Sequence, residues 1–430
     1  MRSLLVFVAA LLIGCGGSDL NTTSAADAGG TPHDAGNGAN DAGSAADAGN
    51  GALDAGAGAD AGTAGCESEP ACAPCAGGGV CVAGRCQQPS CGDGCLDTAR
   101  GEQCDDGNTA NLDGCDSRCH LEQQQRMVSM QIQFGGAGAC PANAIGAAVS
   151  YAQARQQMQA TIDANVLAGS INVALMLQDL VDPTGAGSQA VRVGGLSGTP
   201  YASPPLRHYD GTHDLDWWYA VDLAGLDAGR QPKQHLAGQI ARGALTAGPG
   251  SLSMSLALGS APARLDFSSV RISATLGAAT PPTESSFATP GHLAAEHLDP
   301  SLSTIGSLGS GQLCGDISAR SLSKLPVPAA ILGAHCTQTF TAASSMLEVL
   351  VAGCTAYGIQ AVITATQPDQ EVPDAPPAGA GGPYKLTVGS GRTVSGCTDF
   401  RGGAAPLDAC LDAAAFSTNL MFATDRVILK

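Results

Sequence analysis

Polar and aromatic side chains that could do chemistry are concentrated in one segment, HYDGTHDLDWWY at 208–219, which holds both tryptophans of the chain. Adjacent residues of a strand point to opposite faces of a sheet, so one Trp ring is expected in the core and the other in solvent. An exposed ring could stack on a sugar while nearby carboxylates accept its hydroxyl groups. The alternative is a structural pair of core and edge aromatics beside turn carboxylates. The candidate ligand-binding residues are Trp217, Trp218, Tyr219, Asp214 and Asp216.

A second group of polar residues places hard oxygen ligands on a Gly-rich loop between cysteines: Asp105, Asp106, Asn108 and Asp113. Calcium prefers such ligands, although the spacing differs from an EF-hand loop, which needs a Glu at its twelfth position. The competing interpretation is turn chemistry, in which Asp and Asn side chains accept hydrogen bonds from nearby backbone N–H groups. We favour the turns. Calcium is the one cofactor that the pattern suggests, and no other cofactor is expected.

Motifs of known enzymes are incomplete in this chain. The segment HLAAEH at 292–297 has one residue more than the helical zinc-binding patterns. Residues 321–324 fit SxxK and residues 417–419 fit SxN, but no KTG follows them. A polysaccharide hydrolase would need two carboxylates that converge in one cleft. The candidates for such a pair are Asp210, Asp214, Asp216 and Glu284 or Glu296. No catalytic residue is assigned.

The charge balance limits the partners of the chain. The 38 Asp and Glu residues outnumber the 20 Lys and Arg residues, which gives a formal charge of −18. Nucleic acids would repel a chain with this excess of negative charge, so they are not expected as partners. The hydrophobic content of 44% is too high for a wholly disordered chain.

The N-terminus carries an export pattern. Met1 and Arg2 precede the apolar run 4–13, which is too short to span a membrane but suits a secretory signal. The run leads into Leu-Ile-Gly-Cys, which resembles the bacterial lipobox. The resemblance implies a signal peptide over 1–14 and a lipidated Cys15, whose acyl chains would anchor the protein stably in a membrane. Gly16 in place of Asp favours the outer membrane. The alternative is an ordinary secretory signal with a chance cysteine.

A low-complexity segment follows Cys15. Residues 16–65 consist mainly of Ala, Gly, Asp, Asn, Ser and Thr, with a recurring Asp-Ala-Gly triplet. The segment has no apolar seam for a coiled coil. We interpret residues 15–65 as the lipidated cysteine and a disordered, self-repelling linker that holds the rest of the chain away from the membrane.

The remaining cysteines are even in number. Ten lie in 66–119 and six lie in 140–410, and even counts in an exported protein indicate disulfides. Residues 66–119 contain no aromatic residue, so disulfides must replace a core there. Oxidation also disfavours zinc, which would need free thiolates. The predicted disulfide cysteines are Cys66, Cys72, Cys75, Cys81, Cys86, Cys91, Cys95, Cys104, Cys115, Cys119, Cys140, Cys314, Cys336, Cys354, Cys397 and Cys410.

The segment 91–119, CGDGCLDTARGEQCDDGNTANLDGCDSRC, resembles the cysteine-rich repeat of exported myxobacterial proteins, with its pattern CGDG, GE.CDDGN and DGC followed by a last Cys. The family repeat has four cysteines, so Cys95 is an extra one. The preceding module, 66–90, has five. We infer that Cys95 pairs back into that module, which gives groups of six and four. The connectivity within each group stays open.

Period-2 alternation of apolar and polar residues predicts that 127–430 is mainly β, a β-sandwich or jelly roll. Clear examples are 251–258 and 270–276. Further predicted strands are 128–134, 171–177, 190–196, 217–221, 359–364, 384–388 and 426–429. Helices are expected over 141–164 and 341–353, the second within a disulfide-pinned helical insert at about 310–356. Cys397 and Cys410 form a plausible local pair, and Cys140 is expected to join the cysteines of the insert.

The layout predicts a lipid-anchored, exported protein of the outer membrane or cell surface, as the resemblance to myxobacterial lipoproteins also implies. The leading functional hypothesis is a non-enzymatic binding or adhesion module, with a glycan or an envelope or matrix protein as its partner. The two alternatives are an exported hydrolase that acts on polysaccharide and a purely structural envelope protein.

Overall fold

The computed structural model describes residues 65–75, 77–112, 114–136, 138–200, 218–256, 263–278, 299, 304–327, 340–341, 343–356, 360–373, 383–426 and 428–429. Several predicted features therefore lie outside the described residues, namely the signal segment, Cys15, most of the linker, Asp113, Cys336, Trp217, the candidate hydrolase carboxylates and the HLAAEH segment. Trp218 and Tyr219 lie in a described strand, but their side chains are outside the description.

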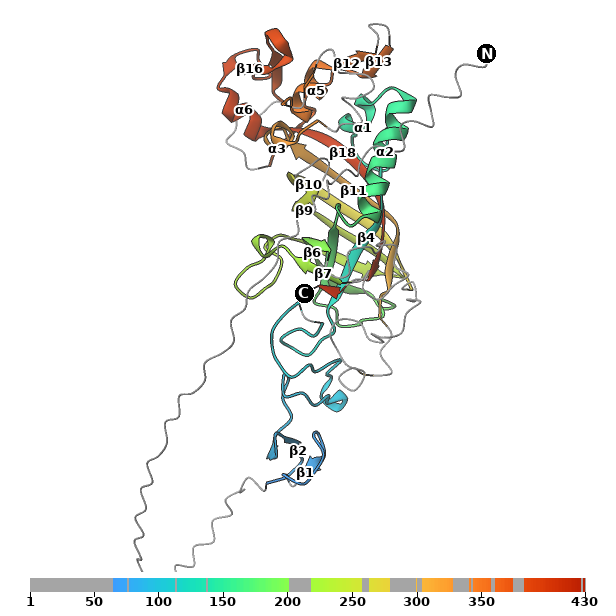
Figure 1. Cartoon of the computed structure of the whole chain (residues 1–430), viewed down its shortest axis with the longest axis vertical. Helices are drawn as coiled ribbons and strands as arrows, with labels where there is room; N and C mark the ends of the chain where they lie inside the picture. Colours follow the sequence, from blue (N-terminus) through green and yellow to red (C-terminus); the bar gives the residue numbers. More distant parts are fainter. Residues whose placement is uncertain are drawn as a thin grey trace, which may run out of the picture. The chain divides into compact units, whose positions relative to one another are not determined.

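Eight antiparallel strands form a closed, barrel-like sheet (Figure 1). Around the sheet the order is β6, β5, β4, β18, β11, β10, β9 and β8, and β8 pairs again with β6. We call this the closed sheet. Its strands are β4 (Gln123–Ile132), β5 (Val173–Gln178), β6 (Gln189–Pro200), β8 (His235–Ala241), β9 (Ala244–Leu256), β10 (Ala263–Gly277), β11 (Ser307–Ser318) and β18 (Ala414–Arg426).

Alternation within the strands fills the interior of the closed sheet with apolar side chains. Leu252 and Met254 of β9 are buried in the main core, and Ser251, which precedes Leu252 in the strand, is exposed. β10 follows the same rule with Leu265 and Phe267. Successive side chains of a strand point to opposite faces, so one face of each strand supplies the core. The mainly-β class predicted from the sequence is thereby confirmed.

The strands belong to one sheet that closes on itself rather than to two stacked layers of a sandwich. Alternation specifies which residues are buried, but a closed sheet and a sandwich bury the same alternate positions. The pairing of β8 with β6, from Gln189↔Ile240 to Gly194↔His235, closes the sheet. Nothing in the pattern of either strand distinguishes this pairing from an open edge.

The helices and most of the short strands gather at one end of the closed sheet, whereas β7 (Trp218–Val221) and β19 (Ile428–Leu429) pair with each other beside β6 (Figure 1). The helices are α1 (Ala144–Ala148), α2 (Ala152–Leu167), α3 (Ala319–Lys324), α5 (Met346–Ala352) and α6 (Leu407–Ala413), with 3-10 turns at Thr98–Arg100, Leu223–Gly225 and Ser390–Arg392. The short strands are β7 (Trp218–Val221), β12 (Cys354–Ala356), β13 (Gln360–Ile363), β14 (Gln370–Glu371), β15 (Lys385–Val388), β16 (Val394–Thr398), β17 (Ala404–Ala405) and β19 (Ile428–Leu429). Within the described part of the chain, no helix combines the length and the apolar character needed to cross a membrane.

Two helix predictions are corrected in their bounds. The predicted helix at 141–164 is broken after Ala148, where Val149 is extended and forms a bridge with Ile363. The predicted helical insert at about 310–356 starts too early, because 307–318 is strand β11 of the closed sheet. The helical part begins at Ala319, where the Ser318 side chain accepts a hydrogen bond from the Ser321 N–H.

The disulfides divide as the cysteine counts predict. The first module, with its small sheet of β1 (Pro74–Cys75), β2 (Gly79–Val82) and β3 (Arg85–Gln87), is joined to the extra cysteine of the repeat by Cys72–Cys95. Cys354 is also disulfide-bonded. The described pairs are Cys66–Cys81, Cys72–Cys95, Cys75–Cys86, Cys91–Cys119, Cys104–Cys115, Cys140–Cys314 and Cys397–Cys410.

Candidate functional site: a polar cleft between the cysteine repeat and the closed sheet

A buried carboxylate organises residues 91–119, which we call the cysteine repeat. Asp105 is fully buried, and its two oxygens accept hydrogen bonds from the backbone N–H groups of Gly92, Gly94 and Gly107 at 2.8–2.9 Å. All three glycines have φ between 82° and 88°, a left-handed conformation that residues with a Cβ rarely adopt. A carboxylate is the acceptor that best satisfies several converging N–H donors. Asp105 therefore fixes the glycine loops around it.

The other oxygen ligands of the predicted calcium cluster also contact the backbone. Asp106 Oδ1 accepts from the Asn108 N–H at 3.3 Å, and Asn108 Oδ1 accepts from the Ala110 N–H at 2.6 Å. These are the i→i+2 contacts of Asx turns. Glu102, Asp105 and Cys119 also lie close together, but the Cys119 sulfur is in a disulfide and is no thiolate ligand. Calcium binding at this loop stays a prediction.

Glu102 has a perturbed acidity in this cluster. Burial raises the pKa of its carboxyl, and the negative charge of Asp105 acts in the same direction. The backbone N–H of Asp97 opposes the shift by donating a hydrogen bond to Glu102 Oε2 at 2.6 Å. This hydrogen bond links the two ends of the 3-10 turn at Thr98–Arg100.

Leu112 joins the repeat to the closed sheet. Its side chain is fully buried in a second apolar cluster with side chains from the outer face of β5 and from β6. On β5, Val173, Leu175 and Leu177 belong to the main core, whereas Ala174 and Met176 belong to this second cluster. The strand is buried on both faces because the repeat covers its outer one. The cluster consists of Leu112, Ala174, Met176, Leu196, Val221 and Leu226.

Glu122 holds the loop that carries Leu112. Its carboxylate accepts from the Leu112 N–H at 2.8 Å and from the Gly114 N–H at 3.0 Å, and the residue is buried. Glu122 directly precedes β4, so the loop is tied to the start of a strand of the closed sheet. On the same loop, Asn111 donates from Nδ2 to the Gly229 carbonyl at 2.8 Å. The contact region between the cysteine repeat and the closed sheet, which we call the joint, therefore contains both apolar and polar contacts.

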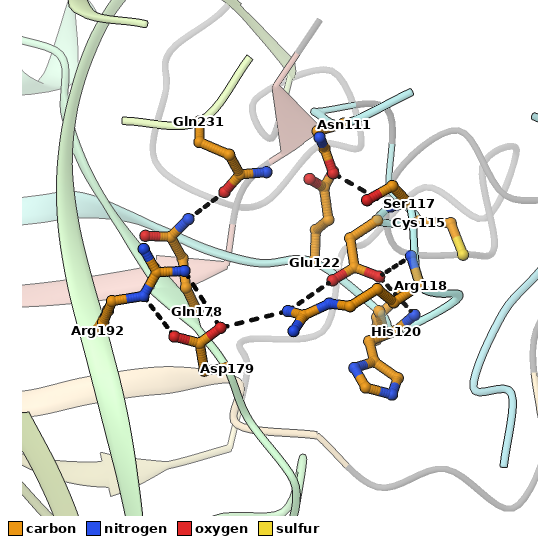
Figure 2. A network of polar contacts seen from close by, with 12 residues as sticks. Asn111, Cys115, Ser117, Arg118, His120, Glu122, Gln178, Asp179, Arg192 and Gln231 are labelled. Atoms are coloured by element: carbon orange, nitrogen blue, oxygen red, sulfur yellow. Dashed lines mark hydrogen bonds and ion pairs between the residues drawn. The ribbon is translucent and has the colours of Figure 1, made fainter. Parts of the chain in front are cut away.

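A chain of ion pairs crosses the joint (Figure 2). Arg118 of the repeat lies 3.3 Å from a carboxylate oxygen of Asp116 and 3.3 Å from one of Asp179. Asp179 follows β5 and also pairs with Arg192 of β6 through two hydrogen bonds. The Arg118 side chain is 57% exposed and that of Arg192 is 41% exposed, so both guanidinium groups can still reach solvent.

These residues line a polar cleft with a volume of about 210 Å³. Planar amide groups complete its wall. Gln178 is buried and donates from Nε2 to Gln231 Oε1, while Asn111 and His120 line the opposite side, as Figure 2 shows. The Oε1 atom of Gln178 is buried and receives no hydrogen bond from the described residues. Such an acceptor is costly to leave unpaired, and its burial sets it apart from the solvent-accessible groups of the cleft.

The cleft offers hydrogen-bond groups of both kinds. Guanidinium and amide N–H groups donate, and the amide and carboxylate oxygens accept. Ligands that carry several neighbouring hydroxyl groups can use both at once. Asp116 and Asp179 are bridged by one arginine, and the charges of the cleft largely cancel.

The pH dependence of the joint follows from Asp179. A hydrogen bond from Arg192 holds the pKa of this carboxyl below its ordinary value, and Arg118 adds to the effect. A lowered folded-state pKa gives stability that is fully present above about pH 4, the unfolded value, and is lost as pH falls through the folded value. We expect wild-type stability to fall more steeply than that of Asp179→Asn between about pH 4 and pH 2. Denaturant unfolding at a series of pH values measures this, and parallel curves would contradict it.

The structure leaves most of the residues predicted for ligand binding untested. Trp217, Asp214 and Asp216 lie outside the described residues, and only the backbones of Trp218 and Tyr219 are described, in β7 beside β6. Val221 at the end of β7 contributes to the second cluster with Leu112. The cleft residues Arg118, Asp179 and Arg192 were not predicted. They are ordinary surface charges in sequence. The pairing of β5 with β6 brings Asp179 beside Arg192, and the docking of the repeat adds Arg118.

In comparisons with known proteins, no family model, curated protein or solved structure matches this chain.

Proposed function

We propose that this chain is a lipid-anchored protein of the cell surface that acts as a non-enzymatic binding module. The polar cleft at the joint is its ligand site. The ligand is rich in hydroxyl groups, such as the end of an envelope or matrix glycan. The observation that carries the proposal is a cleft of about 210 Å³ whose arginine and amide groups are held in place from both sides. Fixed polar groups bind with a smaller loss of side-chain entropy.

Two features favour binding over hydrolysis at this cleft. A glycosidase needs one carboxyl with a raised pKa as its general acid. Here the arginines lower the pKa of Asp179, and Glu122 is buried and occupied by two backbone N–H groups. The hydrolase hypothesis therefore depends on the carboxylates at 210–216, 284 and 296. That hypothesis and the structural envelope protein both stay predictions.

The binding test uses the full chain on a glycan array, followed by titration of each glycan that is retained. We expect Arg118→Gln to weaken binding by about tenfold or more, because it removes charge-assisted hydrogen bonds. The matched control is Arg100→Gln, which alters a half-exposed arginine of the same repeat that is paired with Asp97 outside the cleft. Retention of no glycan, or equal affinity of both variants, would refute the cleft as a glycan site.

The anchoring part of the proposal has its own test. Cys15→Ala removes the acceptor of the acyl chains, and a protein that has lost two or more chains leaves the bilayer. We expect the variant to move from the membrane fraction to the soluble fraction, whereas Ser18→Ala, three residues further on, stays with the membrane. Immunoblots of the two fractions measure this. Unchanged partitioning of Cys15→Ala would refute the anchor.

A further inference from the structure

A cavity with an apolar lining lies where the helices cover one end of the closed sheet. Its volume is about 100 Å³, and its walls come from β4, β10, β11, β18 and helices α1, α2, α3 and α5. Apart from Thr161 and Thr418, every lining residue is aliphatic, methionine or phenylalanine. The Thr161 hydroxyl donates to the Gln157 carbonyl at 2.9 Å, so it is engaged within α2. This cavity is separate from the polar cleft, with which it shares no residue.

Water is a poor occupant of this space. A buried water needs two to four polar partners, and an apolar cavity without them stays dry. Protein interiors otherwise pack as densely as organic crystals and leave few voids larger than a water molecule. An apolar cavity of roughly 150 Å³ accommodates benzene or xenon. A volume of about 100 Å³ therefore suits a few carbon atoms of an aliphatic chain.

The lining can adapt to such a chain. Met130 of β4, Met158 of α2 and Met346 of α5 meet at this cavity. Methionine side chains are unbranched and polarisable, and they fit irregular apolar ligands with little strain. Three of the eight methionines of the chain line this one space.

Helix α2 covers the cavity with few buried side chains for its length. Its buried side chains are only Ala154, Ile162 and Val166, a narrow stripe on one face. No side chain caps its N-terminus. Gln159 ties the helix to the end of β4 by donating to the Met130 carbonyl at 2.8 Å and accepting from the Ile132 N–H at 3.2 Å. A small displacement of α2 would open the cavity while the closed sheet stays intact.

We propose that this cavity is a binding site for the end of an aliphatic chain, which enters beneath α2. The chain end can belong to a free hydrophobic molecule or to the acyl chain of a lipid, because both present the same methyl and methylene groups to the lining. The site is independent of the glycan-binding proposal, since it uses other residues and another ligand chemistry.

The test is a titration with hexane, followed by NMR of ¹³C-labelled methionine methyl groups. The full chain carrying Cys15→Ala is used so that no detergent enters the sample. We expect the methyl signals of Met130, Met158 and Met346 to shift and saturate. Buried methionines outside the cavity (Met127, Met176 and Met254) are internal controls that stay in place. No shift at the three cavity methionines, or equal shifts at all six, would overturn the proposal.

A filling variant and a lipid sample complete the design. Leu322→Phe places a ring into the cavity from α3 and should weaken the hexane response at least tenfold, whereas Leu411→Phe on α6 keeps it. If the filling variant does not fold, the wild-type titration alone decides. The lipidated chain in phospholipid vesicles then identifies the source. If the methyl signals of the cavity methionines in the vesicle sample already lie at their hexane-bound positions, the occupant is the acyl chain of a lipid. If they lie at their ligand-free positions and still shift with hexane, the occupant is a free hydrophobic molecule.

Discussion

In the Asp105→Asn variant, the cysteine repeat is expected to open about a hundredfold more often than it does in the wild type. The substitution keeps one oxygen, which can serve Gly94 and Gly107, but sets an amide NH₂ against the N–H of Gly92. Two donors then face each other in a fully buried place. Loss of a hydrogen bond to a buried charged group and the unpaired donor together cost about 3 kcal/mol, which corresponds to roughly a hundredfold in an equilibrium constant.

The buried disulfide Cys104–Cys115 reports this opening, because its residues are 0% and 1% exposed and a reductant reaches them only when the repeat opens. Reduction in native buffer, followed by alkylation and mass spectrometry, gives the rate. The matched control is Asp106→Asn, in which the neighbouring carboxylate accepts from Asn108 by a longer contact of 3.3 Å. We expect less than about a threefold change for this control. Equal reduction rates in both variants would show that Asp105 does not organise the loops.

Leu112→Ala is expected to lower the free energy of unfolding by about 2–4 kcal/mol. The leucine is fully buried against the outer face of β5 and β6, and the loop that carries it is held in place by Glu122, so the space cannot collapse easily. Leu112 has φ of 71°, and Ala suffers the same backbone strain there, so the substitution reports on the side chain alone.

The matched control for this prediction is Leu223→Ala. Leu223 belongs to the 3-10 turn beside the second cluster but is 66% exposed, and its truncation should cost less than about 0.5 kcal/mol. Unfolding in guanidinium chloride, followed by circular dichroism, compares both variants with the wild type. If the two truncations cost the same, the repeat is not docked on the sheet through Leu112.

Strands with regular alternation could be predicted from the sequence, and three strands of the closed sheet with glycine or polar interruptions (β8, β11 and β18) could not. β9 and β10 alternate Leu, Met and Ile with Ser and Arg, and the prediction holds for both. β11 was missed because Gly309, Gly311 and Gly315 make it look like a loop. Gly311 is needed in the strand, since a Cβ there would lie 2.5 Å from the ring of Phe422 in the neighbouring strand β18.

β18 was missed for a related reason. Phe416, Leu420 and Phe422 share its buried face, but Thr418 interrupts the apolar run at the position between them. Thr418 is also buried and lines the apolar cavity beneath the helices. A polar residue on a buried face weakens the alternation signal.

The disulfide groups could be predicted from the cysteines of the sequence, whereas the residues of the polar cleft could not. The resemblance to a four-cysteine repeat marks Cys95 as an extra cysteine and, with the even count, predicts that it pairs into the first module; the structure pairs it with Cys72. The polar cleft depends instead on the docking of two segments far apart in sequence. Arg118 and Asp179 are separated by 61 residues, and neither position carries a motif. Their proximity is a product of tertiary structure alone.

The repeat and the closed sheet are expected to form one folded unit with a fixed cleft between them. Hydrogen exchange of the Leu112 and Gly114 amides tests it most directly, because both donate to the buried carboxylate of Glu122 at the joint. We expect these amides to exchange as slowly as those of β5, on which the loop is docked. Exchange at the rate of an exposed loop would show that the repeat moves freely, and the cleft would then not exist as a fixed site.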